Sequence, residues 1–235
     1  MEGSTFSEKL RSLFTRTSGA SSTPSYGAPP LPLCRQSVSS PSLTHEPRHS
    51  RGLEQFFLNY KERVGLSILD LGSANQENIQ FLTGLGHQVT NRDVLRSIDN
   101  IFGAEPSAQS NVSGIEYFLA ENFNFLPDAF DGILLWDTLQ FMNAPLLNAT
   151  IDRLHFITTP KSYLAGFFNA TERISEMPNY TFRILDDKTM KMNERGRRTS
   201  GQVFNNRNIE KAFARFDTVK FFLTRDNLRE VIVRR

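Results

Sequence analysis

The sequence contains a single cysteine, Cys34, so no intramolecular disulfide can form. No run approaches the roughly twenty apolar residues of a membrane-spanning helix. The first residues also lack the apolar stretch of a secretory signal. Because oxidising compartments favour paired cysteines, a lone cysteine fits a reducing one. These absences predict a cytoplasmic protein with no stable membrane insertion.

Several kinds of catalytic chemistry also lack their sequence signatures. There is no Cys/His cluster with zinc spacing, no phosphate-binding P-loop and no nucleophile elbow. No metal site is predicted. The histidines offer little more: His87 lies in an expected helix–strand turn and is predicted to be structural. His155 lies inside an apolar helix and is predicted to be half-buried rather than a catalytic base.

Composition divides the chain in two near residue 51. Residues 1–50 hold twelve serines and six of the eleven prolines, with few large apolar side chains. Such a segment cannot bury enough apolar surface to offset the entropy of ordering it, which predicts a flexible tail. Within it, Phe6 to Arg16 has the spacing of a short amphipathic helix, and docking on the domain or disorder is favoured over membrane contact. Residues 51–235 have the size of one domain.

Charge is distributed unevenly over that domain. Residues 51–182 carry eight Lys/Arg against fifteen Asp/Glu, whereas residues 183–235 carry fourteen against seven. The two parts either attract each other and solvate two faces, or the basic part forms a rim for an anionic substrate. Lys191 to Arg198 is interpreted as a solvated loop, with a lid or an anion clamp as the alternative. Its glycine and its charges forbid a stable strand.

Hydrophobic periodicity predicts alternating strands and helices. Strands are expected at 66–71, 88–90, 115–119, 130–135, 162–168, 219–223 and 228–233, and helices at 53–63, 77–85, 146–156 and 209–216. The last two strands flank a turn at 224–227 and form an antiparallel hairpin. The sequence therefore predicts an α/β fold, a Rossmann-like three-layer sandwich with a mixed, mostly parallel seven-stranded sheet and a C-terminal antiparallel hairpin.

Ligands of open α/β sheets bind beyond the carboxyl ends of the strands, so the residues that follow each strand are the candidate site. Gly72 permits a sharp turn after the first strand, and the small residues Ser73, Ala74 and Asn75 let a ligand approach the backbone. Asp70 precedes this loop and Asp93 follows the second strand, where a carboxylate suits a ribose diol. The later positions are Glu121 and Asn122 after the third strand, and Trp136 and Asp137 after the fourth.

These segments resemble the class I S-adenosylmethionine-dependent methyltransferases of the type 11 kind. Ile68-Leu-Asp-Leu-Gly72 is similar to their first motif, and Gly86 to Asp93 resembles their second strand with its terminal acid. Phe125 to Leu139 is similar to their fourth-strand region, and the C-terminal hairpin matches their reversed last strand. The resemblance covers about Leu53 to Arg235.

The resemblance implies S-adenosylmethionine as cofactor. The loop after the first strand should lie near the methionine part, Asp93 at the ribose, Glu121 with Asn122 at the adenine edge, and Trp136 with Asp137 on the substrate side. The implied cofactor-binding residues are Asp70, Gly72, Ser73, Ala74, Asn75, Asp93, Glu121, Asn122 and Trp136. Two residues depart from the family pattern, because Ala74 and Gln76 stand where it has glycines. Gln76 either begins the helix and points away or crowds the pocket.

The resemblance predicts methyl transfer from S-adenosylmethionine to an acceptor that the sequence does not identify. Asp137 is a weak candidate for a base or substrate anchor, from its position only. Two alternatives remain open. One is a non-catalytic methyltransferase-like binding or scaffolding module, motivated by Ala74, Gln76 and the long tail. The other is an RNA- or nucleotide-directed methyltransferase, motivated by the basic C-terminal part. The adenine-specific Asn/Asp-Pro-Pro-Tyr signature is absent, with Trp136-Asp-Thr-Leu139 in its place.

Overall fold

The structure is a computed structural model that describes residues 46–235 except 171–172, 174–175 and 225–227. The predictions for the N-terminal tail, including the amphipathic segment 6–16 and Cys34, lie outside the described residues. So does most of the turn expected at 224–227. Among the described residues, no helix combines the length and the apolar character that crossing a bilayer requires.

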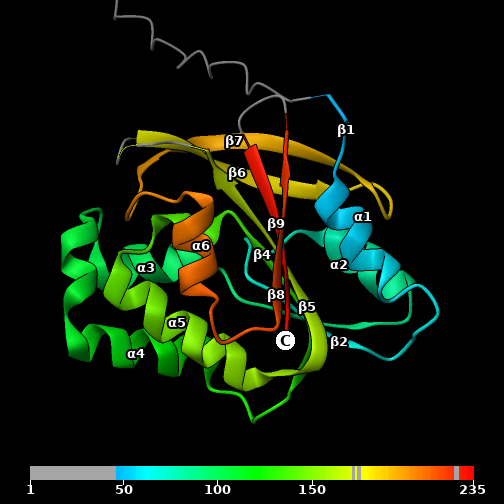
Figure 1. Cartoon of the computed structure of the whole chain (residues 1–235), viewed down its shortest axis with the longest axis horizontal. Coiled ribbons are helices and arrows are strands. Elements are labelled where there is room, and N and C mark those ends of the chain that lie inside the picture. Colours follow the sequence, from blue (N-terminus) through cyan, green and yellow to red (C-terminus); the bar gives the residue numbers. More distant parts are fainter. Residues whose placement is uncertain (1–45, 171–172, 174–175, 225–227) are drawn as a thin grey trace, which may run out of the picture. The chain divides into compact units, whose positions relative to one another are not determined.

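A six-stranded sheet forms the centre of the fold (Figure 1). Its strands, in spatial order, are β3 (Gln88–Asn91), β2 (Ser67–Asp70), β4 (Phe130–Trp136), β5 (Thr158–Asn169), β9 (Leu228–Arg234) and β8 (Thr218–Leu223). The first four are mutually parallel, and β9 runs antiparallel to both of its neighbours. The parallel α/β organisation and the antiparallel C-terminal hairpin are confirmed.

Helices cover both faces of this sheet (Figure 1). On one face lie α1 (Arg51–Leu58) and α2 (Gln76–Gly84); on the other lie α3 (Val94–Phe102), α4 (Val112–Phe123), α5 (Ala144–Ile157) and α6 (Asn206–Ala212). Short 3-10 helices, η1 (Pro106–Ser110) and η2 (Thr138–Phe141), complete the helical elements. Each face has its own buried hydrophobic cluster, so both sides of the central strands β2, β4 and β5 are covered.

A second sheet lies over the carboxyl ends of the parallel strands (Figure 1). It consists of β1 (Arg48–His49), β7 (Thr189–Thr199) and β6 (Glu176–Ile184), paired in that order. β6 and β7 form a long antiparallel hairpin between β5 and α6. The sequence predicts no strand between residues 168 and 219, so this hairpin was not expected. It places side chains over the expected site that were not among the predicted site residues.

The strand predicted at 115–119 is wrong, because these residues lie inside helix α4. The side chain of Asn111 caps this helix by accepting a hydrogen bond from Gly114 N at 2.8 Å. Ile115, Phe118 and Leu119 then pack on one side at helical spacing. A short apolar run does not by itself distinguish a strand from a buried helix. The described part of the sheet therefore has six strands where seven were expected.

The prediction that Lys191 to Arg198 cannot form a strand is also wrong, since these residues belong to β7. Met190 and Met192 alternate with more exposed residues and enter the hydrophobic cluster that also holds Phe182. The charged side chains of β7 therefore lie at strand positions that are not buried in the core. Gly196 lies at an irregularity in the pairing rather than breaking the strand.

Candidate functional site

The loop after β2 is built around the buried carboxylate of Asp70, which is 1% exposed. Its Oδ1 accepts hydrogen bonds from Gly72 N at 2.9 Å and from Trp136 Nε1 at 2.6 Å. Burial raises the pKa of Asp70 to about 6, and these two donors oppose that rise. Asp70 thus joins the end of β2 to the end of β4.

Trp136 lies across this loop with its backbone at φ +49°, a conformation rare for residues other than glycine. Its ring stacks on Phe182 of the hairpin, with centroids 4.8 Å apart, and on Phe167 of β5 at 6.0 Å. A Cβ at Gly72 would lie 2.8 Å from Cδ1 of the indole. Gly72 is therefore required here because the indole packs directly on its backbone.

Asp93 ends the connection after β3 and begins α3. Its Oδ1 accepts from Arg96 N at 3.1 Å as the helix cap, and its Oδ2 accepts from Ser73 Oγ at 2.8 Å. The Ser73 hydroxyl in turn accepts a hydrogen bond from Arg195 on β7. A chain of contacts therefore runs from α3 through the loop to the hairpin.

Asp137 follows Trp136 and is 2% exposed. Its Oδ2 accepts from Tyr180 N of β6 at 3.0 Å. Burial raises the pKa of Asp137 to about 7, although the Tyr180 N–H and the more distant Arg198 and Arg195 lower it. The carboxyl group therefore titrates near neutral pH, which is typical of functional sites as well as of buried structural pairs.

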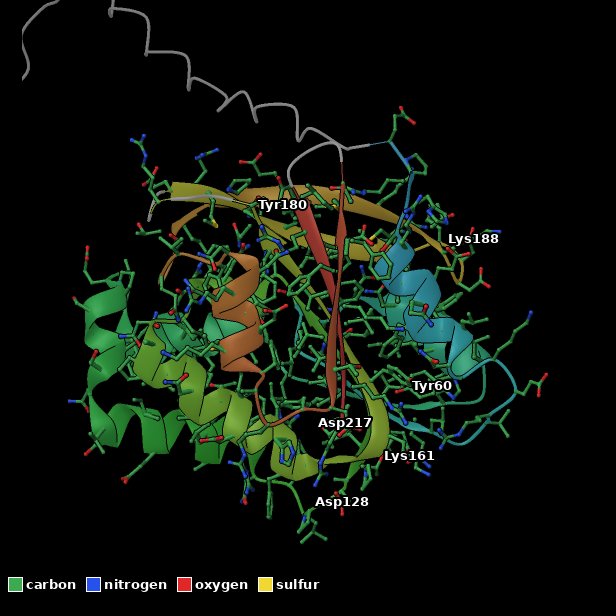
Figure 2. The ribbon with its side chains drawn as sticks, viewed as in Figure 1. Tyr60, Asp128, Lys161, Tyr180, Lys188 and Asp217 are labelled. Atoms are coloured by element: carbon green, nitrogen blue, oxygen red, sulfur yellow. The ribbon has the colours of Figure 1, made fainter. Side chains whose placement is uncertain are left out.

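The β6–β7 hairpin covers the loop after β2 and is joined to α2 through backbone groups of β6. Asn78 of α2 is buried; its Nδ2 donates to Phe182 O at 2.9 Å and its Oδ1 accepts from Ile184 N at 2.8 Å. Tyr180 lies at the hairpin end of the molecule in Figure 2, opposite Asp128 and Asp217. The hairpin is thus hydrogen-bonded to α2, the helix that follows the loop.

A pocket of about 320 Å³ lies between this loop and the hairpin. Its lining comes from four places in the chain: residues 71–78, Asp93 with Leu95, residues 136–138, and residues 180–182 with Arg195. The volume is at the low end of the range of roughly 300–1,000 Å³ typical of small-molecule sites.

The pocket brings together most of the residues singled out in the sequence. Its lining includes Gly72, Ser73, Ala74, Asn75, Asp93, Trp136 and Asp137. Asp70 does not line the pocket but holds Gly72 and Trp136, which do. Gln76 is the first residue of α2; it is exposed and is among the residues that line the pocket.

Glu121 and Asn122 lie on α4 and are not among the residues that line this pocket. Glu121 Oε2 accepts from Ser97 Oγ at 2.7 Å, and Asn122 Nδ2 donates to the same hydroxyl at 2.7 Å. Both side chains thus join α4 to α3. Of the histidines considered in the sequence, His87 is buried and His155 is half-buried with its ring edge-on to Phe216.

Sequence reasoning missed Tyr180 and Phe182 of the hairpin, together with Asn78, and included Arg195 only within the run Lys191 to Arg198, for which an anion clamp was the alternative. The basic run around Arg195 was the one available signal. No group of three or more His, Cys, Asp or Glu side chains that could hold a metal occurs in the part of the chain that the structure describes.

No family model matches the chain, and no curated protein sequence matches it. Solved structures similar to it include S-adenosylmethionine-dependent methyltransferases. One is from Methanosarcina mazei, at 14% identity over 75% of this chain and 95% of that one, with a TM-score of 0.45. A protein from Pyrococcus horikoshii OT3 has 14% identity over 78% and 87%, with a TM-score of 0.48.

A third similar structure is the 1,6-didemethyltoxoflavin-N1-methyltransferase of Burkholderia thailandensis, which was solved with bound 1,6-didemethyltoxoflavin and S-adenosylhomocysteine. It is 13% identical over 78% of this chain and 75% of that one, with a TM-score of 0.40. The sequence identities and TM-scores of these three structures are low. The fold and the site described above rest on this chain's own strand order and contacts.

Proposed function

We propose that the protein binds S-adenosylmethionine in the pocket beneath the β6–β7 hairpin and transfers its methyl group to an acceptor. The observation that carries this proposal is the pocket itself. Its lining includes the Gly72–Asn75 loop, Asp93 and the Trp136–Asp137 segment. These three segments are far apart in the sequence, and the resemblance places all of them next to the same cofactor.

The side chains present suit the parts of that molecule. The Asp93 carboxylate can accept hydrogen bonds from a ribose diol in place of the Ser73 hydroxyl. Leu95 offers an apolar contact next to it, and Ser73 to Asn75 form a wall of small side chains. Bound there, S-adenosylmethionine supplies a methyl group on a sulfonium, which an aligned nucleophile can accept without a compulsory general base.

Asp137 is the carboxyl group in the pocket lining that is best placed to orient or deprotonate an acceptor. It is buried, it is anchored by Tyr180 N, and its pKa lies near neutrality. Changing Asp137 to Asn keeps a hydrogen-bond acceptor for Tyr180 N. In this proposal the change lowers turnover without lowering cofactor affinity.

One observation favours the alternative of a non-catalytic module. The indole of Trp136 packs on Gly72 and occupies the Asp70 carboxylate, so these two residues are already satisfied within the protein. In this alternative the pocket has lost its affinity for the cofactor and the fold serves as a binding surface. The nucleic-acid alternative has less support, because Arg198 is paired with Asp99 at 2.6 Å.

Trp136 is the only tryptophan of the chain and lines the pocket, so its emission reports directly on ligand binding. We expect S-adenosylmethionine and S-adenosylhomocysteine to change this emission and to raise the unfolding temperature. At about a hundred times Kd a ligand stabilises the folded state by roughly 2.7 kcal/mol. For a domain of this size that corresponds to a shift on the order of 5–10 °C.

The matched variants are Asp93→Asn and Asp217→Asn. Asparagine keeps the helix cap at position 93 and removes the charge. Asp217 is exposed and lies at the opposite end of the sheet (Figure 2). We expect weaker binding for the first variant only. If neither ligand alters the emission or the unfolding temperature of the unmodified protein at millimolar concentration, the non-catalytic module replaces this proposal.

A further inference from the structure

Arg195 occupies a β-bulge in the hairpin. Tyr180 is paired with Glu194 and Asn179 with Gly196, so Arg195 has no opposite residue on β6. A bulge re-aims the side chain of the extra residue and is frequent next to functional sites. Here the guanidinium reaches the loop after β2 and donates a hydrogen bond to Ser73 Oγ.

Arg195 is also the only Lys or Arg among the described residues that line the pocket. Its neighbours on β7 are engaged elsewhere. Arg198 makes a two-point contact with Asp99 at 2.6 and 2.8 Å, and Arg197 lies 3.9 Å from Glu194. Within the described part of the chain, Arg195 forms no ion pair, and its side chain donates a hydrogen bond to the neutral hydroxyl of Ser73.

A guanidinium that lines a pocket, forms no ion pair and donates its hydrogen bond to a neutral hydroxyl is suited to an anionic group of the ligand. Its planar set of donors matches a carboxylate in two-point geometry, which a lysine does not reproduce. Helix α2 begins at Gln76, three residues after Ser73, and the positive end of its dipole also favours an anion near the loop. Arg195 and the start of α2 both lie next to the loop that contains Ser73.

We propose that Arg195 is a specificity-determining residue that binds the carboxylate of the ligand's amino-acid part, exchanging its bond to Ser73 for that carboxylate. The inference rests on the proposed function and deepens it. The pocket then selects an adenosyl amino acid over an adenosyl thioether that has no carboxylate.

The test compares two probes that differ in this group. S-adenosylhomocysteine has the carboxylate, whereas 5′-methylthioadenosine keeps the adenosine and the sulfur and lacks the amino-acid part. Affinities are measured through Trp136 emission for the full chain, for Arg195→Gln and Arg195→Lys, and for the control Arg197→Gln. Arg197 is on the same strand and does not line this pocket.

We expect Arg195→Gln to weaken S-adenosylhomocysteine binding on the order of 10- to 100-fold, the size typical of a charge-assisted hydrogen bond. Its affinity for 5′-methylthioadenosine stays within about twofold of the unmodified protein, since that probe has no anionic group for Arg195. Arg195→Lys gives an intermediate loss, because the charge remains without the planar geometry. Arg197→Gln leaves both affinities unchanged.

Two results overturn this inference while leaving the proposed function intact. Equal weakening of both probes by Arg195→Gln means that Arg195 acts only through Ser73 and Asp93. Unchanged affinity for S-adenosylhomocysteine means that the carboxylate is held elsewhere or that the arginine serves a second molecule. Failure of the unmodified protein to bind either probe instead overturns the proposed function, and the role of Arg195 with it.

Discussion

At the scale of single residues, Trp136 shows how the site stores strain. A positive φ at a bulky residue is unfavourable by about 1–3 kcal/mol and persists only where the surroundings impose it. Here the hydrogen bond to Asp70 and the stacked rings of Phe182 and Phe167 impose it. The indole therefore contacts residues of β2, β5 and the hairpin. We expect a rearrangement of the pocket to alter its emission.

Asp137 gives a prediction of pH dependence. Its pKa rises from 3.8 to about 7 on folding because the group is buried. Between these values the folded state holds a proton that the unfolded state has lost, so the contribution of Asp137 to stability falls as pH rises through about 7. Each unit of pKa shift corresponds to about 1.4 kcal/mol. Asp137→Asn removes this titration.

We therefore expect Asp137→Asn to gain at least about 1 kcal/mol of stability relative to the unmodified protein when pH is raised from 4.5 to 8. Urea unfolding at several pH values measures the difference. Asp217→Asn, at an exposed position, should follow the unmodified protein throughout. Parallel curves for Asp137→Asn and the unmodified protein would mean that the carboxyl group is not raised toward neutral pH by burial.

The sequence predicted the residues of the site that depend on local order along the chain. Gly72 to Asn75, Asp93 and Trp136 follow expected strands directly, and the carboxyl ends of parallel strands meet at one edge. Arg195 could not be assigned in this way. Its contact with Ser73 spans 122 positions and depends on a bulge, which has no reliable sequence signal. Glu121 and Asn122 were placed after a strand that is in fact helix α4.

At the scale of elements, the β6–β7 hairpin is held by Asn78 of α2. Its side chain satisfies Phe182 O and Ile184 N, and it is 2% exposed. Removing it leaves Ile184 N without its partner in a buried place, at a cost of about 1–3 kcal/mol, whereas Phe182 O keeps a longer hydrogen bond from Asn75 Nδ2 at 3.3 Å. This amide holds the hairpin over the pocket together with the Asp137–Tyr180 and Ser73–Arg195 hydrogen bonds.

We expect Asn78→Ala to lower the free energy of unfolding by about 1–3 kcal/mol, partly offset by the higher helix propensity of alanine. Urea unfolding measures the change, and Trp136 emission shows whether Phe182 has moved away from the indole. Gln80→Ala, at an exposed position of the same helix, should change stability by less than about 0.5 kcal/mol. Equal effects of the two substitutions would contradict the role given to Asn78.

Two elements show where local pattern stops being informative. Residues 115–119 form an apolar run that suits a strand or a buried helix equally, and the Asn111 cap decides for the helix. The charged run at 191–198 forms a strand because long-range pairing with β6 and burial of Met190 and Met192 override its weak β propensity. In both cases contacts with residues outside the segment stabilise the observed structure.

At the scale of the whole molecule, Glu230 of β9 joins the two ends of the described fold. Its Oε2 accepts from Ser50 Oγ at 3.0 Å and from Gly52 N at 2.6 Å, and Arg48 lies 3.7 Å from Oε1. The boundary expected at residue 51 follows a change in composition. Arg48 and Ser50 precede it and are nevertheless tied to the last strand, through contacts that span about 180 positions and leave no local trace.

These contacts predict coupling between Ser50 and Glu230. The Ser50 Oγ caps α1 by accepting a hydrogen bond from Leu53 N at 3.0 Å. Ser50→Ala removes this cap and should lower the free energy of unfolding by about 1–2 kcal/mol. Glu230→Ala deprives Ser50 Oγ and Gly52 N of their buried acceptor and should cost about 2–4 kcal/mol. Because both variants break the Ser50–Glu230 bond, the double variant should cost about 1 kcal/mol less than the two single losses together.

Thermal and urea unfolding of the four proteins measure this coupling. Glu54→Gln is the matched control on α1, where the carboxylate is half exposed and lies 3.2 Å from His49. We expect that control to change stability by less than about 1 kcal/mol and to add independently to Glu230→Ala. Strict additivity between Ser50→Ala and Glu230→Ala would mean that the first helix and the last strand are stabilised separately, and that Ser50 acts only as a helix cap.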